Sequence, residues 1–188
     1  MTFQKLILLF VIVLLGNAEV QAQQFISQKA QFNIKVKNES CKTETSSVAL
    51  SANIDQKTGS VSFSIPVATF QLKSRVEELR FWGHCFPKDK YPMIYFAGKL
   101  ENVEKWATNK SGIIPLKLKG HFEINGERIP LSENIVLQVD TKSDRKGDSK
   151  LDTKNVELAF NTTIVSEELD LDIDVVINLV EQSKGGPQ

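Results

Sequence analysis

Residues 79–98, LRFWGHCFPKDKYPMIYFAG, hold the densest aromatic cluster of the chain and its clearest change of hydrophobic period. Three apolar residues and one glycine recur there, or just before, at helical spacing: Val76, Leu79, Gly83 and Phe86. Ser74 and Glu77 have the form of a capping box, in which a hydroxyl and a carboxylate satisfy the first free amides of a helix. We therefore predict a short helix from about residue 75 to residue 84 or 85, ended by Pro87.

The second half of this stretch, and most of the chain around it, alternates between apolar and polar residues as β-strands do. Segments with this pattern are 32–36, 48–54, 61–67, 94–100, 114–124, 129–139, 156–164 and 169–180. Asn125-Gly126 lies between two of them and predicts a tight hairpin, because both residues accept positive φ. Residues 102–112 and 140–155 are polar and poor in apolar residues, so we interpret them as loops.

About eight strands joined mostly by hairpins predict an all-β chain folded as an antiparallel barrel with one short helical insert. Closing the sheet would remove the unpaired edges that so many strands otherwise expose. A β-sandwich is the alternative, since strand periodicity does not separate the two. A helical insert between strands is typical of a barrel with a plug or a lid.

The first residues have the pattern of a secretory signal peptide. Lys5 precedes an unbroken apolar run over residues 6–15, and small residues follow up to Ala22, after which we place cleavage. The apolar run is shorter than the ~20 residues that a membrane span needs, so no integral membrane segment is expected after cleavage. The predicted division is a signal peptide at 1–22, one barrel domain at 23–183 and a flexible tail at 184–188.

The charge balance and the two cysteines limit the classes of partner. Acidic and basic residues number 23 each, so there is no basic excess to neutralise the phosphates of a nucleic acid. An exported chain meets oxidising conditions, under which Cys41 and Cys85 can form a disulfide. They can equally be two separate buried thiols. Their spacing matches no common zinc pattern.

Nothing in the sequence indicates catalysis, a metal or a cofactor. His84 and Cys85 are adjacent, but neighbours on a helix point ~100° apart, and no third group that would orient them is recognisable. His121 lies on the outward side of its predicted strand. The acidic residues of segment 170–174 lie in a line on one strand face, which does not wrap a calcium ion.

The remaining candidate is the set of inward-facing apolar side chains. An eight-stranded barrel can be filled by its own side chains or can hold one small ligand, and the strand count does not decide which. If there is a cavity, its predicted lining is Phe63, Ile65, Leu79, Trp82, Phe86, Phe96, Leu118, Phe122 and Phe160.

Three stretches, in their order and spacing, resemble the YceI-like family of exported, polyisoprenoid-binding bacterial proteins: Ser60–Phe70, Leu79–Gly98 and Leu118–Leu131. The resemblance implies a lipocalin-like barrel around an apolar tunnel that binds a long isoprenoid or acyl chain, with no catalytic centre. The chain departs from the family at Glu127-Arg128-Ile129 and at residues 165–169, so the family's head-group contacts are not carried over.

The leading hypothesis from the sequence is a periplasmic or secreted bacterial protein that sequesters an isoprenoid or fatty-acyl lipid. The second is a structural or stress-related barrel with a filled core and no ligand, and the third is a small-molecule enzyme that uses His84. A homodimer is compatible with all three.

Overall fold

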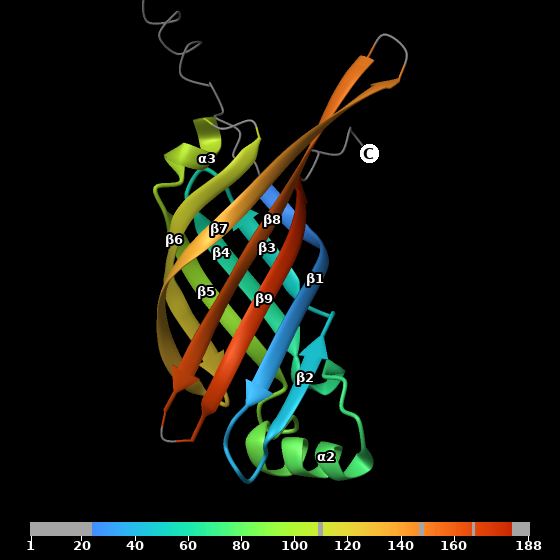
Figure 1. Ribbon diagram of the computed structural model, residues 1–188, viewed down its shortest axis with the longest axis vertical. Helices are drawn as coiled ribbons and strands as arrows, with labels where there is room; N and C mark the ends of the chain where they lie inside the picture. Colours follow the sequence, from blue (N-terminus) through green and yellow to red (C-terminus); the bar gives the residue numbers. More distant parts are fainter. Residues whose placement is uncertain (1–23, 109–110, 147–148, 167, 182–188) are drawn as a thin grey trace, which may run out of the picture.

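The computed structural model describes residues 24–108, 111–146, 149–166 and 168–181. The predicted signal peptide and the predicted tail lie outside these residues. Nine antiparallel strands form one sheet that closes on itself, because β1 pairs with β9 (Figure 1). The predicted all-β barrel is therefore confirmed and the sandwich alternative is wrong. The strands are β1 Gln24–Val36, β2 Thr43–Ser47, β3 Ser51–Asp55, β4 Ser60–Pro66, β5 Met93–Glu101, β6 Gly112–Ile124, β7 Glu127–Lys146, β8 Ser149–Val165 and β9 Asp170–Glu181.

Alternation of side chains builds the core. Apart from Gly112 and Gly120, every second residue of β6 is buried inside the barrel, as is every second residue of β9, while the residues between them are more exposed. Because successive side chains of a strand point to opposite faces, each strand gives the interior one apolar row. The hairpin predicted at Asn125 and Gly126 is confirmed, with φ values of 53° and 78°.

The strand predicted at 48–54 is only partly correct. Its second half is β3, but Val48 is exposed and lies in a link between β3 and the unpredicted strand β2. Both strands pair with the same edge of β1, so eight strands close the barrel and β2 is the extra one. The chain bends between them because Ser47 Oγ accepts a hydrogen bond from the amide of Ala49 at 3.1 Å.

The loop predicted at 140–155 is wrong. β7 and β8 continue to pair from Asp140 opposite Asn155 to Lys146 opposite Ser149. The resulting hairpin extends beyond the barrel, as the orange ribbon at the top of Figure 1 shows. Two paired strands satisfy the hydrogen bonds of each other's backbone N–H and C=O groups without needing an apolar row. The sequence of this hairpin therefore lacks the apolar–polar alternation by which strands are predicted.

Helical segments lie at both ends of the barrel (Figure 1). At one end, α2 (Arg75–Arg80) runs into a π-helical turn, Phe81–Cys85, which confirms the predicted helix. Ser74 Oγ accepts from the amide of Glu77 at 3.2 Å, as the capping box requires. At the other end lies α3 (Glu104–Thr108), within a segment predicted to be a polar loop. Within the described ranges, no helix is long and apolar enough to cross a bilayer.

Candidate functional site

A cluster of five phenylalanines occupies the middle of the barrel. The five come from β1, β4, β5, β6 and β8 and are almost inaccessible to solvent: Phe32, Phe63, Phe96, Phe122 and Phe160. Phe63 is central, because its ring is stacked on Phe96 at 4.7 Å and lies 5.7 Å from that of Phe122. Its ring centroid is also within 6.4 Å of Phe32 and 6.3 Å of Phe160. At this level the interior is packed with rings that touch across the barrel.

Two glycines make room for one of these rings. Gly98 of β5 lies directly opposite Gly120 of β6. A Cβ added to either glycine would lie 2.7 or 2.8 Å from Cζ of Phe96. The Phe96 ring therefore lies over the space that two side chains would otherwise fill.

A second aromatic cluster covers the α2 end of the barrel. Phe81 and Phe86 stack at 4.6 Å, and Phe70 lies 5.6 Å from Phe81. Phe70 also lies 6.2 Å from Phe32, so this cluster is continuous with the cluster in the middle of the barrel. The apolar interior therefore reaches the helical insert without a break.

Seven of the nine predicted lining residues lie in the buried core; their contact with a ligand stays a prediction. Leu79 is a correction, because its side chain is 60% exposed on the outer side of α2. The reason is the π-helical turn, in which the amide of Phe86 bonds to the carbonyl of Phe81, five residues earlier. This wider turn moves the buried face onto Phe81 and Cys85. Trp82 is only partly buried, under the ammonium of Lys88 at 3.7 Å from the ring centroid.

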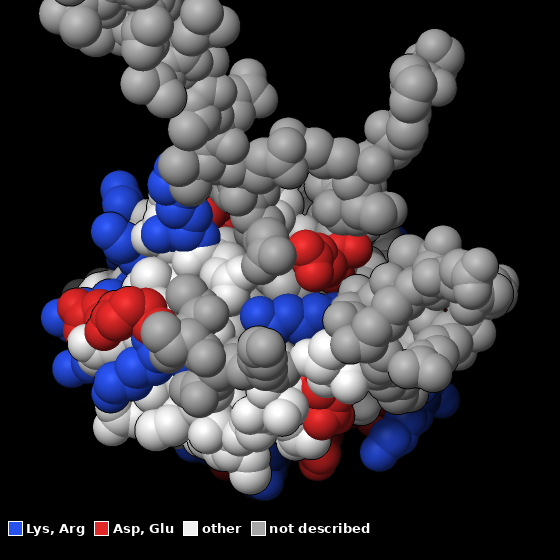
Figure 2. Space-filling view, turned by 90° about the horizontal axis from the view of Figure 1, so that it is seen from above, with Lys and Arg blue, Asp and Glu red and all other residues white. Residues whose placement is uncertain are grey.

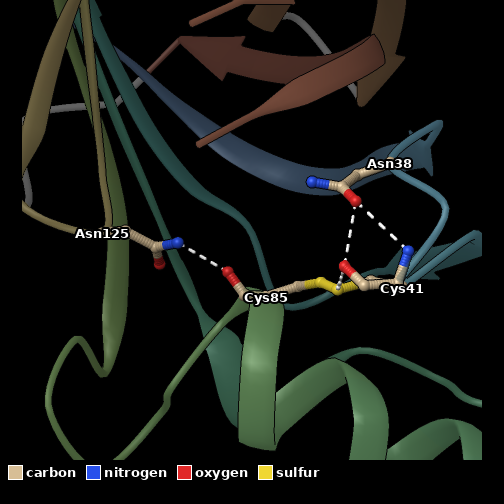
Figure 3. Close-up of a disulfide and its surroundings, with 5 residues drawn as sticks. Asn38, Cys41, Cys85 and Asn125 are labelled. Carbon is tan, nitrogen blue, oxygen red and sulfur yellow. Dashed lines mark hydrogen bonds between the residues drawn. A yellow bond between two sulfur atoms is a disulfide. The ribbon is translucent and has the colours of Figure 1, made fainter. Parts of the chain in front are cut away.

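A disulfide joins Cys41 to Cys85, with their Cα atoms 6.2 Å apart (Figure 3). Cys41 follows β1, and Cys85 ends the π-helical turn. The side-chain amide of Asn125, in the turn between β6 and β7, donates a hydrogen bond from Nδ2 to the backbone carbonyl of Cys85. The helical insert is thus fixed to the rim of the barrel at two points, one of them covalent.

The opposite end is closed by Trp106 of α3. Its burial could not be predicted from the sequence pattern, because the residues around it are mostly polar. Its side chain is completely buried, and its ring centroid lies 4.9 Å from that of Phe25 in β1. Lys154 of β8 places its ammonium 5.7 Å from the Trp106 centroid and 5.9 Å from that of Phe25. Desolvation lowers the pKa of Lys154 below its ordinary value, and attraction from Glu181 opposes this only in part.

The barrel wall contains a weakly joined seam between β7 and β8. Backbone pairing of β7 with β8 ends at Val136 opposite Ala159, although both strands continue toward the α2 end. Side chains join them there: Thr162 Oγ1 donates to Glu133 Oε1 at 2.9 Å, and Ser166 Oγ donates to a glutamate of β7, also at 2.9 Å. Glu133 therefore puts a carboxylate into the barrel wall.

The outer face is polar. A groove of about 690 Å³ crosses β2, β1, β9 and β8, and its outward side chains include Asn33, Lys35 and Asp172. Hydrogen bonds from Lys37 and Thr163 hold the pKa of Asp172 below its ordinary value. Because these charges are exposed, the ion pairs among them contribute little to stability.

The described residues contain no group of three or more His, Cys, Asp or Glu side chains placed to hold a metal ion. Cys85 is in the disulfide, so it does not present a thiol to His84. His121 lies at the outer surface, with Nδ1 3.2 Å from a guanidinium nitrogen of Arg128. The described interior is made almost wholly of apolar side chains.

A closed eight-stranded antiparallel barrel with an apolar interior and helical covers is a lipocalin-like barrel. No protein-family model matches the sequence, and no curated protein matches it either. A polyisoprenoid-binding domain from Saccharophagus degradans, implicated in plant cell wall breakdown, has a similar structure. Its TM-score is 0.63 at 10% identity, covering 86% of this chain and 100% of that chain.

The YceI protein of Campylobacter jejuni also matches, with a TM-score of 0.46 at 14% identity, covering 80% of this chain and 85% of that chain. The likeness to the Saccharophagus domain confirms the barrel fold that the resemblance to the YceI-like family implied.

Proposed function

We propose that this chain is a YceI-like, exported lipid-binding protein that holds a polyisoprenoid or fatty-acyl chain inside its barrel. The observation that carries the proposal is the continuous apolar interior, from Phe81 and Phe86 at one end to Phe25 and Trp106 at the other. The fold shared with a polyisoprenoid-binding domain supports the same ligand class.

Burial of the chain would provide the affinity. Each methylene moved from water to an apolar interior contributes ~0.8 kcal/mol, so ten contribute about 8 kcal/mol before the costs of ordering the chain. To admit it, the phenylalanines of the middle cluster exchange contacts with one another for contacts with the chain. Both kinds of contact are apolar, so the rings stay out of water in either state. Binding of this kind discriminates poorly between chain lengths.

A filled, ligand-free barrel is the second candidate, and the close contacts of Phe63 with its four ring neighbours favour it. The two candidates differ in what the purified protein contains. We would purify the mature protein without detergent from its own host and analyse an organic extract by mass spectrometry. A prenyl or acyl lipid at about one per chain supports the proposal, whereas a lipid-free extract from folded protein contradicts it.

Two variants locate the lipid. Phe122→Asp puts a charge on the inner face of β6, and Tyr95→Asp puts the same charge on the outer face of β5. We expect the first variant to lose the lipid and the second to keep it, with circular dichroism confirming that each is folded. A folded Phe122→Asp protein with full lipid content would exclude the barrel interior as the binding site.

Export is tested separately by N-terminal sequencing of the protein recovered outside the cytoplasm. We expect the mature chain to start at Gln23, directly after the predicted cleavage point. A start at Met1 would contradict cleavage.

A further inference from the structure

Lys154 is an exception among the inward-facing residues of β8. Val156, Leu158 and Phe160 are buried inside the barrel, and Lys154 is the next position on the same face. A charged side chain in such a row lies partly out of water and loses hydration. The position of Lys154 therefore has a desolvation cost.

The surroundings of Lys154 compensate its charge only in part. Its ammonium lies over the rings of Phe25 and Trp106. Among the described residues no carboxylate forms an ion pair with it, and Glu181 attracts it only from farther away. Rings that exclude water strengthen any electrostatic contact made between them. The ammonium is thus placed to attract an anion.

Trp106 contributes a second donor without an acceptor. Its side chain is completely buried, yet its Nε1 has no hydrogen-bond partner. Buried donors in native proteins nearly always have an acceptor. The α3 end of the apolar barrel thus holds two donors, the Lys154 ammonium and the unpaired Trp106 indole N–H. A single anionic group could accept hydrogen bonds from both.

We propose that the α3 end of the barrel is a subsite for an anionic head group, a carboxylate or a phosphate, held by the Lys154 ammonium and the Trp106 indole N–H. The inference rests on the proposed function, because the apolar tail of the same ligand fills the barrel. It narrows the ligand class from apolar chains in general to amphiphiles with one negatively charged end.

Figure 2 shows this end from above, with basic and acidic side chains interspersed over the part that is not grey. The described part of this surface therefore shows no broad positive patch that would collect anions. Recognition of the head group depends on the local contact with Lys154, so a single substitution should remove it.

The test compares three ligands with the same sixteen-carbon chain: hexadecanoate, hexadecyl phosphate and hexadecanol. Affinities are measured at pH 7 by calorimetry and by fluorescence in a Trp82→Phe background, where Trp106 is the only indole. Hydrogen bonds to charged groups are stronger than neutral ones, so we expect the anions to bind roughly tenfold more tightly than the alcohol.

In Lys154→Met each anion should bind about as tightly as hexadecanol, so that the ratio of anion affinity to alcohol affinity falls to about one. In Lys154→Arg the preference for the anions should persist. Trp106→Phe, measured by calorimetry, should reduce the preference by a smaller factor. Lys99→Met removes an exposed lysine from β5 and is the matched control, in which the wild-type ratio is expected.

The outcomes separate the two proposals. If all three ligands bind equally in the wild-type protein, the barrel binds lipid and the head-group subsite is wrong. A preference that survives in Lys154→Met also overturns the subsite. If none of the three binds, the barrel does not hold a fatty-acyl chain, and the subsite, which was argued for such an amphiphile, is wrong. Inorganic phosphate alone should not displace hexadecanoate at millimolar concentration; displacement would identify a site for free anions and contradict a head-group subsite.

Discussion

The disulfide between Cys41 and Cys85 is the feature whose removal has the most calculable effect. The two residues are 44 positions apart, and closing a loop of that length in the unfolded chain corresponds to about 4 kcal/mol at 25 °C on the chain-entropy model. We therefore expect Cys41→Ala, Cys85→Ala and the double variant each to lower the free energy of unfolding by about 4 kcal/mol.

Urea denaturation followed by circular dichroism measures this effect. With a slope of roughly 2 kcal/mol per molar urea, each variant should unfold at a concentration about 2 M lower than the oxidised wild-type protein. The slope should also rise slightly, because an unfolded chain without the cross-link exposes more surface. Wild-type protein in reducing buffer should match the variants.

The pattern among the variants is as informative as the size of the shift. Since either substitution abolishes the same bond, the double variant should be no less stable than either single one, and additive losses would refute the reasoning. A midpoint within about 0.5 M of the wild-type value would also refute it. Ser40→Ala, next to Cys41 and exposed, is the control and should change the free energy of unfolding by at most about 0.5 kcal/mol.

Three further predictions concern packing, the seam and charge. Gly120→Ala should lower the free energy of unfolding by about 1–3 kcal/mol in urea titrations, because its Cβ would collide with the Phe96 ring. Thr162→Val should cost about 1 kcal/mol in the same assay by removing the donor to Glu133. Asp172→Asn should lower Tm slightly at pH 7, and the difference should vanish as the pH falls below 3.8, through the lowered pKa of Asp172.

Each of these predictions has a control. Gly83→Ala adds a methyl group where no atom lies within 4 Å, so it should not lower the free energy of unfolding and should raise it by up to about 1 kcal/mol. Thr163→Val, on the outer face next to Thr162, should cost less than Thr162→Val. For the charge, the sign is decisive: a carboxyl with a lowered pKa stabilises the fold only while it is ionised. A deficit of Asp172→Asn that persists at pH 2 would show that the lost stability is not electrostatic.

The barrel could be predicted from the sequence because each of its strands buries one apolar row, which is visible as apolar–polar alternation.

The strand segments that were not predicted are stabilised by hydrogen bonds rather than by apolar burial. Thr43–Ser47 forms β2 through backbone pairing and the hydrogen bond from Thr45 Oγ1 to the carbonyl of Gln71, with few apolar side chains. The β7–β8 hairpin likewise needs no apolar row. Polar strands of this kind cannot be told from loops by periodicity.

The buried interior was predicted correctly in its middle, whereas its α3 end was not predicted. The phenylalanines around Phe63 lie in regular strands, where alternation separates inside from outside. Leu79 was assigned to the interior on a spacing of 3.6 residues, which the π-helical turn interrupts. Trp106 and Lys154 come from segments 48 residues apart that only the closure of the sheet brings together. No local pattern connects them.

The two ends of the barrel differ in what has to break before they open. The α2 end is fixed by a covalent bond, whereas the α3 end is closed by the contact of Trp106 with Phe25. We therefore expect a bound amphiphile to enter tail first and to leave head first through the α3 end. Loading and release of the ligand would then use the same opening of the barrel.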